Sequence, residues 1–462
     1  SKVYIDLFSC YFREDKINAV LIQCPVAIRT NWKNEFAVHC PVEFEAMVCD
    51  PSSKKQEREI LEFVTKQTDK LKVLITGIES VSQRDSKKNK PFGKAYEITE
   101  KFMLLHRAAM GVDEGHLIKN HDSNRAQNVR SLGLMAKIRG IATGTPIANG
   151  IMDLYMQFEY LSENIVGIGD YYSFRNRYAV MGGFENKEII GYDNVEELME
   201  LIRPWTYQCS KKDALPDLPD KVYQRREVML SKKQQEMYDK IKKDRQATLP
   251  VLDFEGENID LVTDMVLSMH TALQQIIGGY VSYDDEDRGE RGKHQIVEWR
   301  HNPKIQELLA VVEESRGLKT IVWAKYRAEI ADIAEALRAK YGDASVVEYH
   351  GGIKKADRDE AEAAFKTDPG VLFFVANQST GGVGLTLNVA KLSVYMSNSF
   401  KYIDRVQSED RNHRIGQGDK VLYVDILAGG TVDIDIENAI LHKQDMSDFV
   451  KQSLAQGTMQ LR

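Results

Sequence analysis

The residues best suited to chemistry are two adjacent carboxylates, Asp113 and Glu114, which end the apolar run AAMGVDE. A short apolar run of this kind predicts a strand that is buried on both faces. Ligands bind at the carboxyl edge of parallel sheets, where one carboxylate can hold the Mg²⁺ that bridges nucleotide phosphates and its neighbour can orient or deprotonate water. The alternative interpretation is a charge pair at the start of a helix.

Two turns rich in glycine and hydroxyl groups follow other apolar runs. The segment TGTPIANG, residues 143–150, suits a tight turn with free donors, or an ordinary strand-to-helix turn with Pro146 at the helix start. The segment NQSTGGVGLTLN, residues 377–388, offers Gly382 and Gly384 for close backbone approach to a phosphate or a nucleic-acid strand. A glycine turn without any ligand is the alternative there.

Two arginines three residues apart, Arg411 and Arg414 in QSEDRNHRIGQ, fall on one face of a predicted helix. The planar guanidinium matches phosphate geometry and neutralises charge on a transferring γ-phosphoryl group. A solvated surface helix is the alternative, and the residue types alone do not decide between the two.

The elements that must position these residues are nine short apolar runs. They alternate with helical stretches, which predicts parallel sheets in an α/β fold. They lie before about residue 145 and after about residue 318, so we expect two α/β lobes with helices between them. The runs are residues 19–25, 72–78, 108–114, 138–143, 320–324, 345–350, 371–377, 392–398 and 421–427.

A hinge is predicted near CSKKDALPDLPDK, where Pro216 and Pro219 stop helices and charged residues crowd together. Beyond it, residues 230–249 have the pattern of a charged helix and residues 282–294 that of a solvated, mobile loop. The expected domains are a first lobe over residues 1–208 with a helical insertion at about 151–205, a linker over 209–225, and a second lobe over 226–462 with a helical insertion at about 226–300.

Composition narrows the class of protein. Of 462 residues, 43% are hydrophobic and 28% are charged, which suffices for real cores and gives no case for disorder. No apolar run approaches the ~20 residues that span a bilayer, which argues against a membrane partner. The 62 basic and 69 acidic residues give a net charge of −7, so any nucleic-acid partner needs a local basic groove.

The five cysteines include no C-x-x-C pair, which argues against a disulfide framework and a zinc site and favours a reducing, intracellular compartment. The first residues, SKVYIDLFSC, lack the basic start and small-residue cleavage site of a signal peptide.

In their order along the chain, the motifs resemble those of superfamily 2 helicases and, more narrowly, of the SNF2 family of double-stranded DNA translocases. The resemblance runs through nearly the whole chain, and TGTPIANG and HRIGQ are its most specific parts. It implies two RecA-like lobes with parallel sheets. The segments that carry it are LIQCPVAIRTNWKNEF, VLITGIESVS, VDEGHLIKN, TGTPIANG, IVWAKYRAEI, EYHGGIKKADRDEAEAAF, the glycine turn and QSEDRNHRIGQ.

The resemblance implies ATP and Mg²⁺ as cofactors, with Asp113 as the Mg²⁺ partner and Glu114 as the base that activates water. His116 would link the nucleotide site to the following motif, or could be a packed core residue. From the second lobe, Gln407, Gly382, Gly384 and the two arginines would face the nucleotide, the arginines as candidate fingers.

The resemblance also implies contacts to the DNA backbone. Such contacts position a protein without reading sequence, so double-stranded or branched DNA is the expected partner. The residues that match DNA-contacting motifs are Pro25, Arg29, Trp32, Thr76, Gly351, Gly352, Ser379 and Thr380.

One departure from the family concerns the P-loop, G-x-x-x-x-G-K-[ST], which occurs nowhere in the 462 residues. Because SKVYIDLFSCYF resembles the helix that follows that loop, we expect Ser1 to be its last residue, a ligand of ATP and Mg²⁺, and the sequence to begin inside the motif. A catalytically dead relative is the alternative. Smaller departures are Gly115 in the acidic motif and Thr386 after the glycine turn.

The function expected from the resemblance is an ATP-dependent DNA translocase that remodels branched DNA in replication, recombination or repair. The alternatives are a translocase that displaces proteins, in RNA polymerase recycling, restriction or chromatin remodelling, and a non-catalytic DNA-binding scaffold. The expected location is the cytoplasm of a bacterial or phage-infected cell, or the nucleus of a eukaryote.

Overall fold

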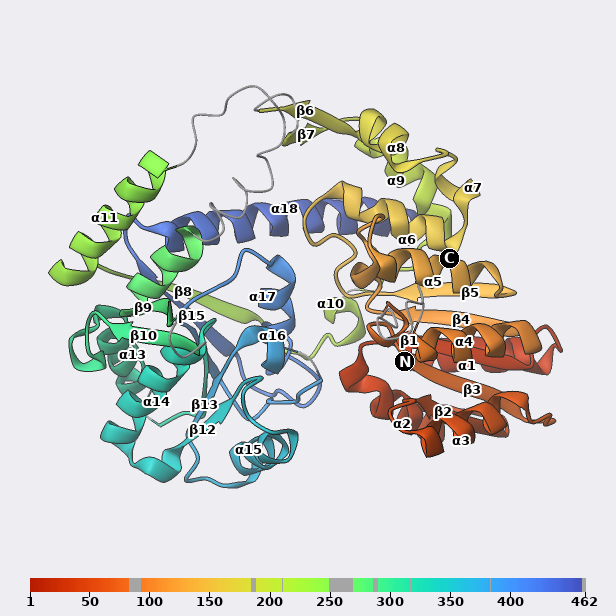
Figure 1. The fold of residues 1–462 in the computed structure, drawn as a ribbon, viewed down its shortest axis with the longest axis horizontal. Helices are drawn as coiled ribbons and strands as arrows, with labels where there is room; N and C mark the ends of the chain where they lie inside the picture. Colours follow the sequence, from red (N-terminus) through yellow and green to blue (C-terminus); the bar gives the residue numbers. More distant parts are fainter. Residues whose placement is uncertain are drawn as a thin grey trace. The chain divides into compact units, whose positions relative to one another are not determined.

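The computed structural model describes residues 1–82, 93–183, 188–209, 211–248, 269–285, 290–315, 317–382 and 384–458. The chain forms two compact units (Figure 1). The first unit comprises Ser1–Gln208 and Lys443–Arg462, and the second comprises Cys209–His442.

The first unit is built on a five-stranded parallel sheet with the strand order β2-β3-β1-β4-β5. Aromatic residues of α1 and α2 pack on one face, where Phe8, Trp32 and Phe36 meet alternate residues of β1 and β3. Helices α3, α4 and α5 cover the other face. The bounds are α1 Lys2–Arg13, β1 Ala19–Cys24, α2 Arg29–His39, β2 Phe44–Cys49, α3 Lys54–Thr65, β3 Leu71–Gly77, α4 Lys94–Leu105, β4 Ala108–Asp113, α5 Asn124–Leu134 and β5 Ile138–Ala142.

The rest of the first unit follows β5. Its helices are α6 (Leu154–Leu161), α7 (Glu163–Val166), α8 (Tyr171–Tyr178) and α9 (Val195–Ile202). The segment expected as a helical insertion at 151–205 thus also contains an antiparallel pair of strands, β6 (Ala179–Gly182) and β7 (Glu188–Tyr192).

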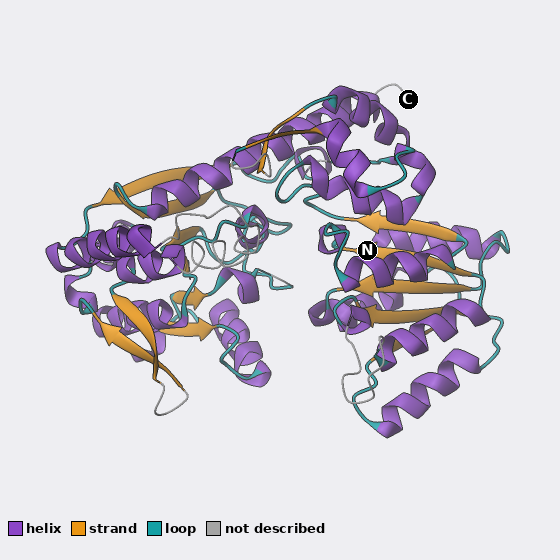
Figure 2. Ribbon diagram, turned by 45° about the horizontal axis from the view of Figure 1, so that its top comes forward, coloured by secondary structure: helices purple, strands orange, loops and turns teal. Residues whose placement is uncertain are grey.

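The second unit has a six-stranded parallel sheet with the order β12-β13-β11-β14-β15-β8, which helices cover on both faces (Figure 2). Residues of α13 and α14 pack on one face, and Phe365 of α15 packs on the other. The bounds are α10 Lys211–Ala214, β8 Lys221–Val228, α11 Lys232–Thr248, β9 Tyr280–Asp285, β10 Glu290–Gln295, α13 Pro303–Glu314, β11 Thr320–Trp323, α14 Arg327–Tyr341, β12 Val346–Tyr349, α15 Lys355–Thr367, β13 Phe373–Ala376, α16 Gln378–Gly381, β14 Leu392–Tyr395, α17 Tyr402–Glu409, β15 Val421–Ala428 and α18 Val432–Thr458.

The α/β fold class is confirmed, and a strand lies at each of the nine predicted apolar runs. In the two large sheets, two edge strands were not predicted. β8 has four charged residues among its eight and is mostly exposed, so its sequence lacks the apolar run of a central strand. β2 is only partly buried over most of its length and contains Glu45. Edge strands have a neighbour on one side only, which weakens the apolar pattern.

Three expected segments differ from the structure. The linker expected at 209–225 includes the first half of β8, which pairs with β15 over its full length. The prediction of a loop at 282–294 is wrong, because β9 and β10 pair antiparallel there. Residues 286–289 of this segment lie outside the described residues. The second lobe was expected to run to residue 462, but the second unit ends at His442 within α18. The residues from Lys443 onward belong to the first unit, where Val450 is fully buried in the core.

Candidate functional site

Asp113 is the last residue of β4, at the carboxyl edge of the first sheet. Its Oδ2 accepts a 2.8 Å hydrogen bond from the indole Nε1 of Trp32, and its Oδ1 accepts one of 3.0 Å from the backbone N–H of Glu114. Burial raises the pKa of Asp113, although the Trp32 hydrogen bond opposes that rise. The carboxylate is therefore oriented by two donors at a ligand-binding edge.

Glu114 has left-handed backbone angles, φ 55° and ψ 55°, which are uncommon for a residue with a Cβ and concentrate at functional sites. Its Oε2 lies 3.2 Å from Nδ1 of the buried His116. That nitrogen also lies 3.5 Å from Oγ1 of Thr143, the first residue of the TGTPIANG segment. The structure therefore brings the acidic motif and the following motif together through His116.

Gly115, one of the expected departures from the family pattern, has close neighbours. A Cβ at this position would lie 2.4 Å from Cγ1 of Ile141, closer than real Cβ contacts allow. A larger residue at this position therefore requires the Ile141 side chain to move.

Ser1 is the N-cap residue of α1, and its hydroxyl donates to Oε2 of Glu35. Within the described residues, no group of three or more His, Cys, Asp or Glu side chains could hold a metal. Mg²⁺ commonly binds through one or two carboxylates and substrate phosphates, so the oxygens of Asp113 fit that ion.

The two arginines of the second unit converge on the glycine turn. Nη1 of Arg411 and Nη1 of Arg414 each donate a 3.1 Å hydrogen bond to the carbonyl oxygen of Leu385. Arg414 also donates to Oγ1 of Thr386 at 2.9 Å. Nε of Arg411 donates to the backbone oxygen of Gln407 at 2.8 Å.

The glycines of this turn are required by its geometry. Gly384 has a φ of 80°, in the left-handed region that glycine tolerates best. A Cβ at Gly382 would lie 2.4 Å from the carbonyl oxygen of Gln378 and 3.7 Å from Cβ of Gln407. The predicted nucleotide-facing residues of the second unit, Gln407, Gly382, Gly384, Arg411 and Arg414, are thus brought together.

The predicted DNA-contacting residues of the second unit also lie together. A Cβ at Gly351 would lie 3.7 Å from Oγ1 of Thr380 and 3.8 Å from Nη2 of Arg327, and one at Gly352 would lie 3.2 Å from Nη1 of Arg327. Ser379 precedes Thr380 and donates to Oδ1 of Asn377 at 2.9 Å. Arg327 was not predicted, because a single arginine after a strand carries no distinctive spacing.

The predicted DNA-contacting residues of the first unit are more enclosed. Trp32 is 4% exposed, Thr76 is fully buried, and Pro25 is buried at the end of β1. Arg29 donates to the carbonyl oxygen of Cys49 at 2.9 Å and pairs with Asp50 at 3.2 Å. Neither Trp32 nor Thr76 presents its side chain to a phosphate without a local rearrangement.

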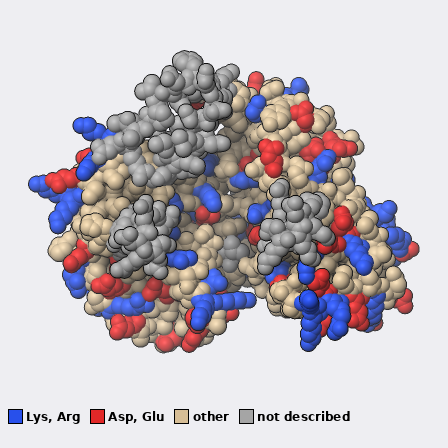
Figure 3. Space-filling view, viewed as in Figure 1, with Lys and Arg blue, Asp and Glu red and all other residues tan. Residues whose placement is uncertain are grey.

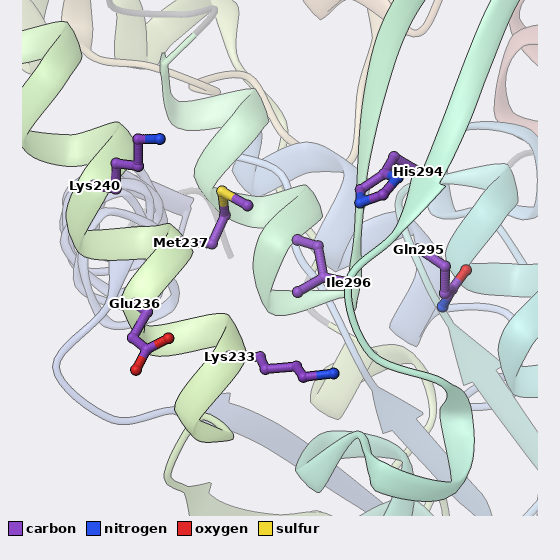
Figure 4. A pocket seen from close by; sticks show the side chains of 7 residues that line it. All are labelled: Lys233, Glu236, Met237, Lys240, His294, Gln295 and Ile296. Atoms are coloured by element: carbon purple, nitrogen blue, oxygen red, sulfur yellow. The ribbon is translucent and has the colours of Figure 1, made fainter.

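A separate cavity of about 410 Å³ lies in the second unit between α11 and residues 294–296 (Figure 4). None of the predicted site residues lines it. Its lining residues are Lys233, Glu236, Met237, Lys240, His294, Gln295 and Ile296.

Two parallel α/β units, one with an acidic motif at its sheet edge and one with paired arginines on a glycine turn, define a protein with two RecA-like lobes. The sequence matches the SNF2-related domain over residues 4–278 and the helicase conserved C-terminal domain over residues 303–416. The chain belongs to the SNF2 family.

Curated relatives of the chain are longer proteins. A Caenorhabditis elegans homologue of SWI/SNF-related matrix-associated actin-dependent regulator of chromatin subfamily A containing DEAD/H box 1 is 23% identical over 475 residues, which cover 94% of this chain and 46% of the relative. The chromatin-remodeling complex subunit snf22 of Schizosaccharomyces pombe is 25% identical over 447 residues, covering 94% of this chain and 25% of the relative. The chain therefore spans less than half the length of either protein.

Among solved structures, the SWI2/SNF2 ATPase core of Sulfolobus solfataricus in complex with double-stranded DNA is 22% identical, with a TM-score of 0.39. The comparison covers 99% of this chain and 88% of that chain.

Proposed function

We propose that the chain is the ATP-hydrolysing part of an SNF2-type translocase that moves on double-stranded DNA. The observation that carries the proposal is that each unit of this SNF2-family chain assembles a motif suited to phosphate chemistry. Asp113, Glu114 and His116 lie together in the first unit, and Arg411 and Arg414 share the carbonyl oxygen of Leu385 in the second.

In this proposal, Glu114 takes the proton of the attacking water, while Arg411 and Arg414 stabilise the charge that develops on the transferred phosphoryl group. Asp113 would hold Mg²⁺, which when bound neutralises phosphate charge. The left-handed backbone of Glu114 supports a functional role, because such strain persists where the surrounding structure enforces it.

The remaining nucleotide contacts are proposed from the same motifs. Ser1 and His116 would contact ATP from the first unit, and Gln407, Gly382 and Gly384 from the second. The P-loop supplies contacts to the β- and γ-phosphates and to Mg²⁺, and its sequence pattern does not occur in the 462 residues. The hydrolysis assays below are therefore designed for the natural protein.

DNA binding is proposed to use phosphate contacts. Gly351, Gly352 and Thr380 lie together with the exposed guanidinium of Arg327. In the first unit, the contact is proposed for the segment from Pro25 to Trp32 and for Thr76. Acidic and basic side chains are mixed over the visible surface of each unit (Figure 3), so binding would depend on such local clusters rather than on overall charge.

Motion would follow from the nucleotide cycle. ATP binding and hydrolysis would alternately close and open the two units, so that one DNA grip shifts relative to the other along the duplex. The finer assignment that we propose is remodelling of branched DNA in replication, recombination or repair. The location would be the cytoplasm in a bacterial or phage-infected cell and the nucleus in a eukaryote. Among the described residues, no helix has the length and apolar character that crossing a membrane requires.

A second candidate function is the displacement of proteins from DNA. It is favoured by the names of the relatives, which include regulators of chromatin and a TATA-binding protein-associated factor from Aspergillus fumigatus that is 23% identical over 478 residues, 95% of this chain and 24% of the relative. RNA polymerase recycling and restriction complexes are further settings for the same activity. A third candidate is a non-catalytic DNA-binding scaffold.

One experiment separates these candidates: the ATPase rate of the natural protein without DNA and with duplex, single-stranded and four-way DNA. We expect stimulation by DNA, with four-way junctions above plain duplexes. Equal stimulation by plain duplex and four-way DNA would favour the second candidate, if the protein also releases a second protein that is bound to the duplex as a roadblock. No stimulation by any DNA would overturn the motor and favour the scaffold.

A further inference from the structure

The arginine motif of the second unit is held by a segment to which the proposed function gives no role. Residues 211–223, here called the connector, run from α10 to the first residues of β8. Along the chain, the connector follows the point where the first unit ends, Gln208, and the second begins. Its side chains contact three residues of the motif that carries Arg411 and Arg414.

Glu409 is the centre of the first set of contacts. Its Oε2 accepts hydrogen bonds from Nζ of Lys221 at 2.7 Å and from the hydroxyl of Tyr223 at 2.8 Å, and its Oε1 accepts one from Nε of Arg405 at 2.6 Å. Burial favours the protonated form of Glu409, but Lys221 and Arg405 together keep its pKa below the ordinary value. The buried carboxylate is thus ionised and depends on both cations.

Asp410 and His413 form the second set. Nζ of Lys211 pairs with Oδ1 of Asp410 and donates to the carbonyl oxygen of His413 at 3.2 Å. Nε2 of His413 lies 2.8 Å from the carbonyl oxygen of Pro219 in the connector. Residues 409, 410 and 413 therefore all bind the connector, and they bracket Arg411 and precede Arg414.

The motif is fixed by the glycine turn as well. The backbone N–H of Leu387 donates to the carbonyl oxygen of Arg411 at 2.8 Å, and both arginine side chains donate to Leu385. The loop that carries the arginines therefore has two sets of anchors, the glycine turn and the connector. Loss of either set would allow the guanidinium groups to shift.

We propose that Lys211 and Lys221 of the connector are positioning residues, which act through Asp410 and Glu409 to hold Arg411 and Arg414 where hydrolysis needs them. The inference rests on the proposed function. It gives the connector a task beyond joining the two units, because a displacement of the connector displaces the arginines. Small displacements matter, since a misplacement of 1 Å in a catalytic group can reduce a rate about a hundredfold.

The test is the kcat for DNA-stimulated ATP hydrolysis by the natural protein with Lys221→Ala. We expect kcat to fall at least about tenfold, with KM for ATP within about twofold, because the arginines act mainly on the transition state. The decisive measurement is a mutant cycle, in which Lys221→Ala is also made in a protein that carries both Arg411→Ala and Arg414→Ala. In that background, Lys221→Ala should change kcat by less than about twofold, because the groups that it positions are absent.

Two further variants keep the test sharp. Tyr223→Phe removes one hydrogen bond to Glu409 and changes no charge. It therefore tests positioning even if Lys221→Ala unfolds the protein, and we expect kcat to fall severalfold. Lys221→Arg should restore part of the rate. The matched control is Lys340→Ala, which removes an exposed pair with Glu313 in the same unit and should leave kcat unchanged.

An unchanged kcat in folded Lys221→Ala and in Tyr223→Phe would overturn the inference. The full loss reappearing in the arginine-free background would also overturn it, since Lys221 would then act independently of the arginines. No DNA-stimulated hydrolysis by the parent protein would instead refute the proposed function, and this inference with it.

Discussion

At the scale of single residues, the contact between Trp32 and Asp113 shows how the acidic motif is held. An indole nitrogen can only donate, so its 2.8 Å hydrogen bond fixes one carboxylate oxygen and leaves the other to the backbone of Glu114. The family resemblance assigned Trp32 to DNA binding. Its contact with Asp113 could not be predicted, because no spacing in the sequence relates residue 32 to residue 113. The same limit applies to Lys211 and Lys221, whose partners Asp410 and Glu409 lie 199 and 188 residues away along the chain.

Glu329 is a buried carboxylate of the segment IVWAKYRAEI. Its Oε2 accepts a 2.6 Å hydrogen bond from Ser397, and burial raises its pKa to about 7, although nearby Lys304 opposes the rise. The folded protein therefore holds this proton more tightly than the unfolded chain, whose Glu pKa is about 4.3. The resulting stability is fully present below about pH 4 and is lost as the pH rises through about 7.

We accordingly predict that Glu329→Gln stabilises the protein at pH 8 by about 2–4 kcal/mol and much less at pH 5, because it removes a buried charge that exists only at the higher pH. Denaturant unfolding at the two pH values measures this difference. The control is Glu313→Gln, an exposed residue that pairs with Lys340. A Glu329→Gln effect of equal size at both pH values would contradict the assignment.

At the scale of elements, the turn after β4 is shaped by the close approach of β5. Left-handed Glu114 redirects the chain, and Gly115 then passes against Ile141. We predict that Gly115→Ala destabilises the protein by about 1–3 kcal/mol, because the added methyl overpacks this contact. Thermal unfolding measures the change, with Gly144→Ala as the control, since nothing lies within 4 Å of a Cβ there. Equal melting temperatures for the two variants would show that the strand yields freely.

The central strands could be predicted from sequence because burial on both faces selects continuous apolar runs, as in β1 and β3. The edge strands β2 and β8 could not, because their exposed faces admit charged residues. The sequence of β9 and β10 has the composition of a solvated loop, and the pairing of these two strands with each other is a tertiary contact that composition does not show. For the candidate site, the family resemblance of the motifs in their order along the chain located them, whereas the contacts that orient them depend on tertiary packing.

At the scale of the whole molecule, the proposed chemistry is divided between two units. The acidic motif belongs to the first unit and the arginine motif to the second, so the groups that we propose for phosphoryl transfer come from both units. Hydrolysis would then require both units to act on one nucleotide, which is how a chemical step becomes linked to movement between them.

The most direct test of this claim is single-turnover ATP hydrolysis by the natural protein with Arg414→Ala, at saturating ATP and DNA. The account predicts that the rate falls by about a thousandfold or more, with ATP affinity changed by less than about tenfold, because an arginine finger stabilises the transition state. Arg338→Ala, which removes a pair with Glu348 in the same unit, serves as the control. Turnover by Arg414→Ala at the parent rate would contradict the claim that the second unit takes part in the reaction.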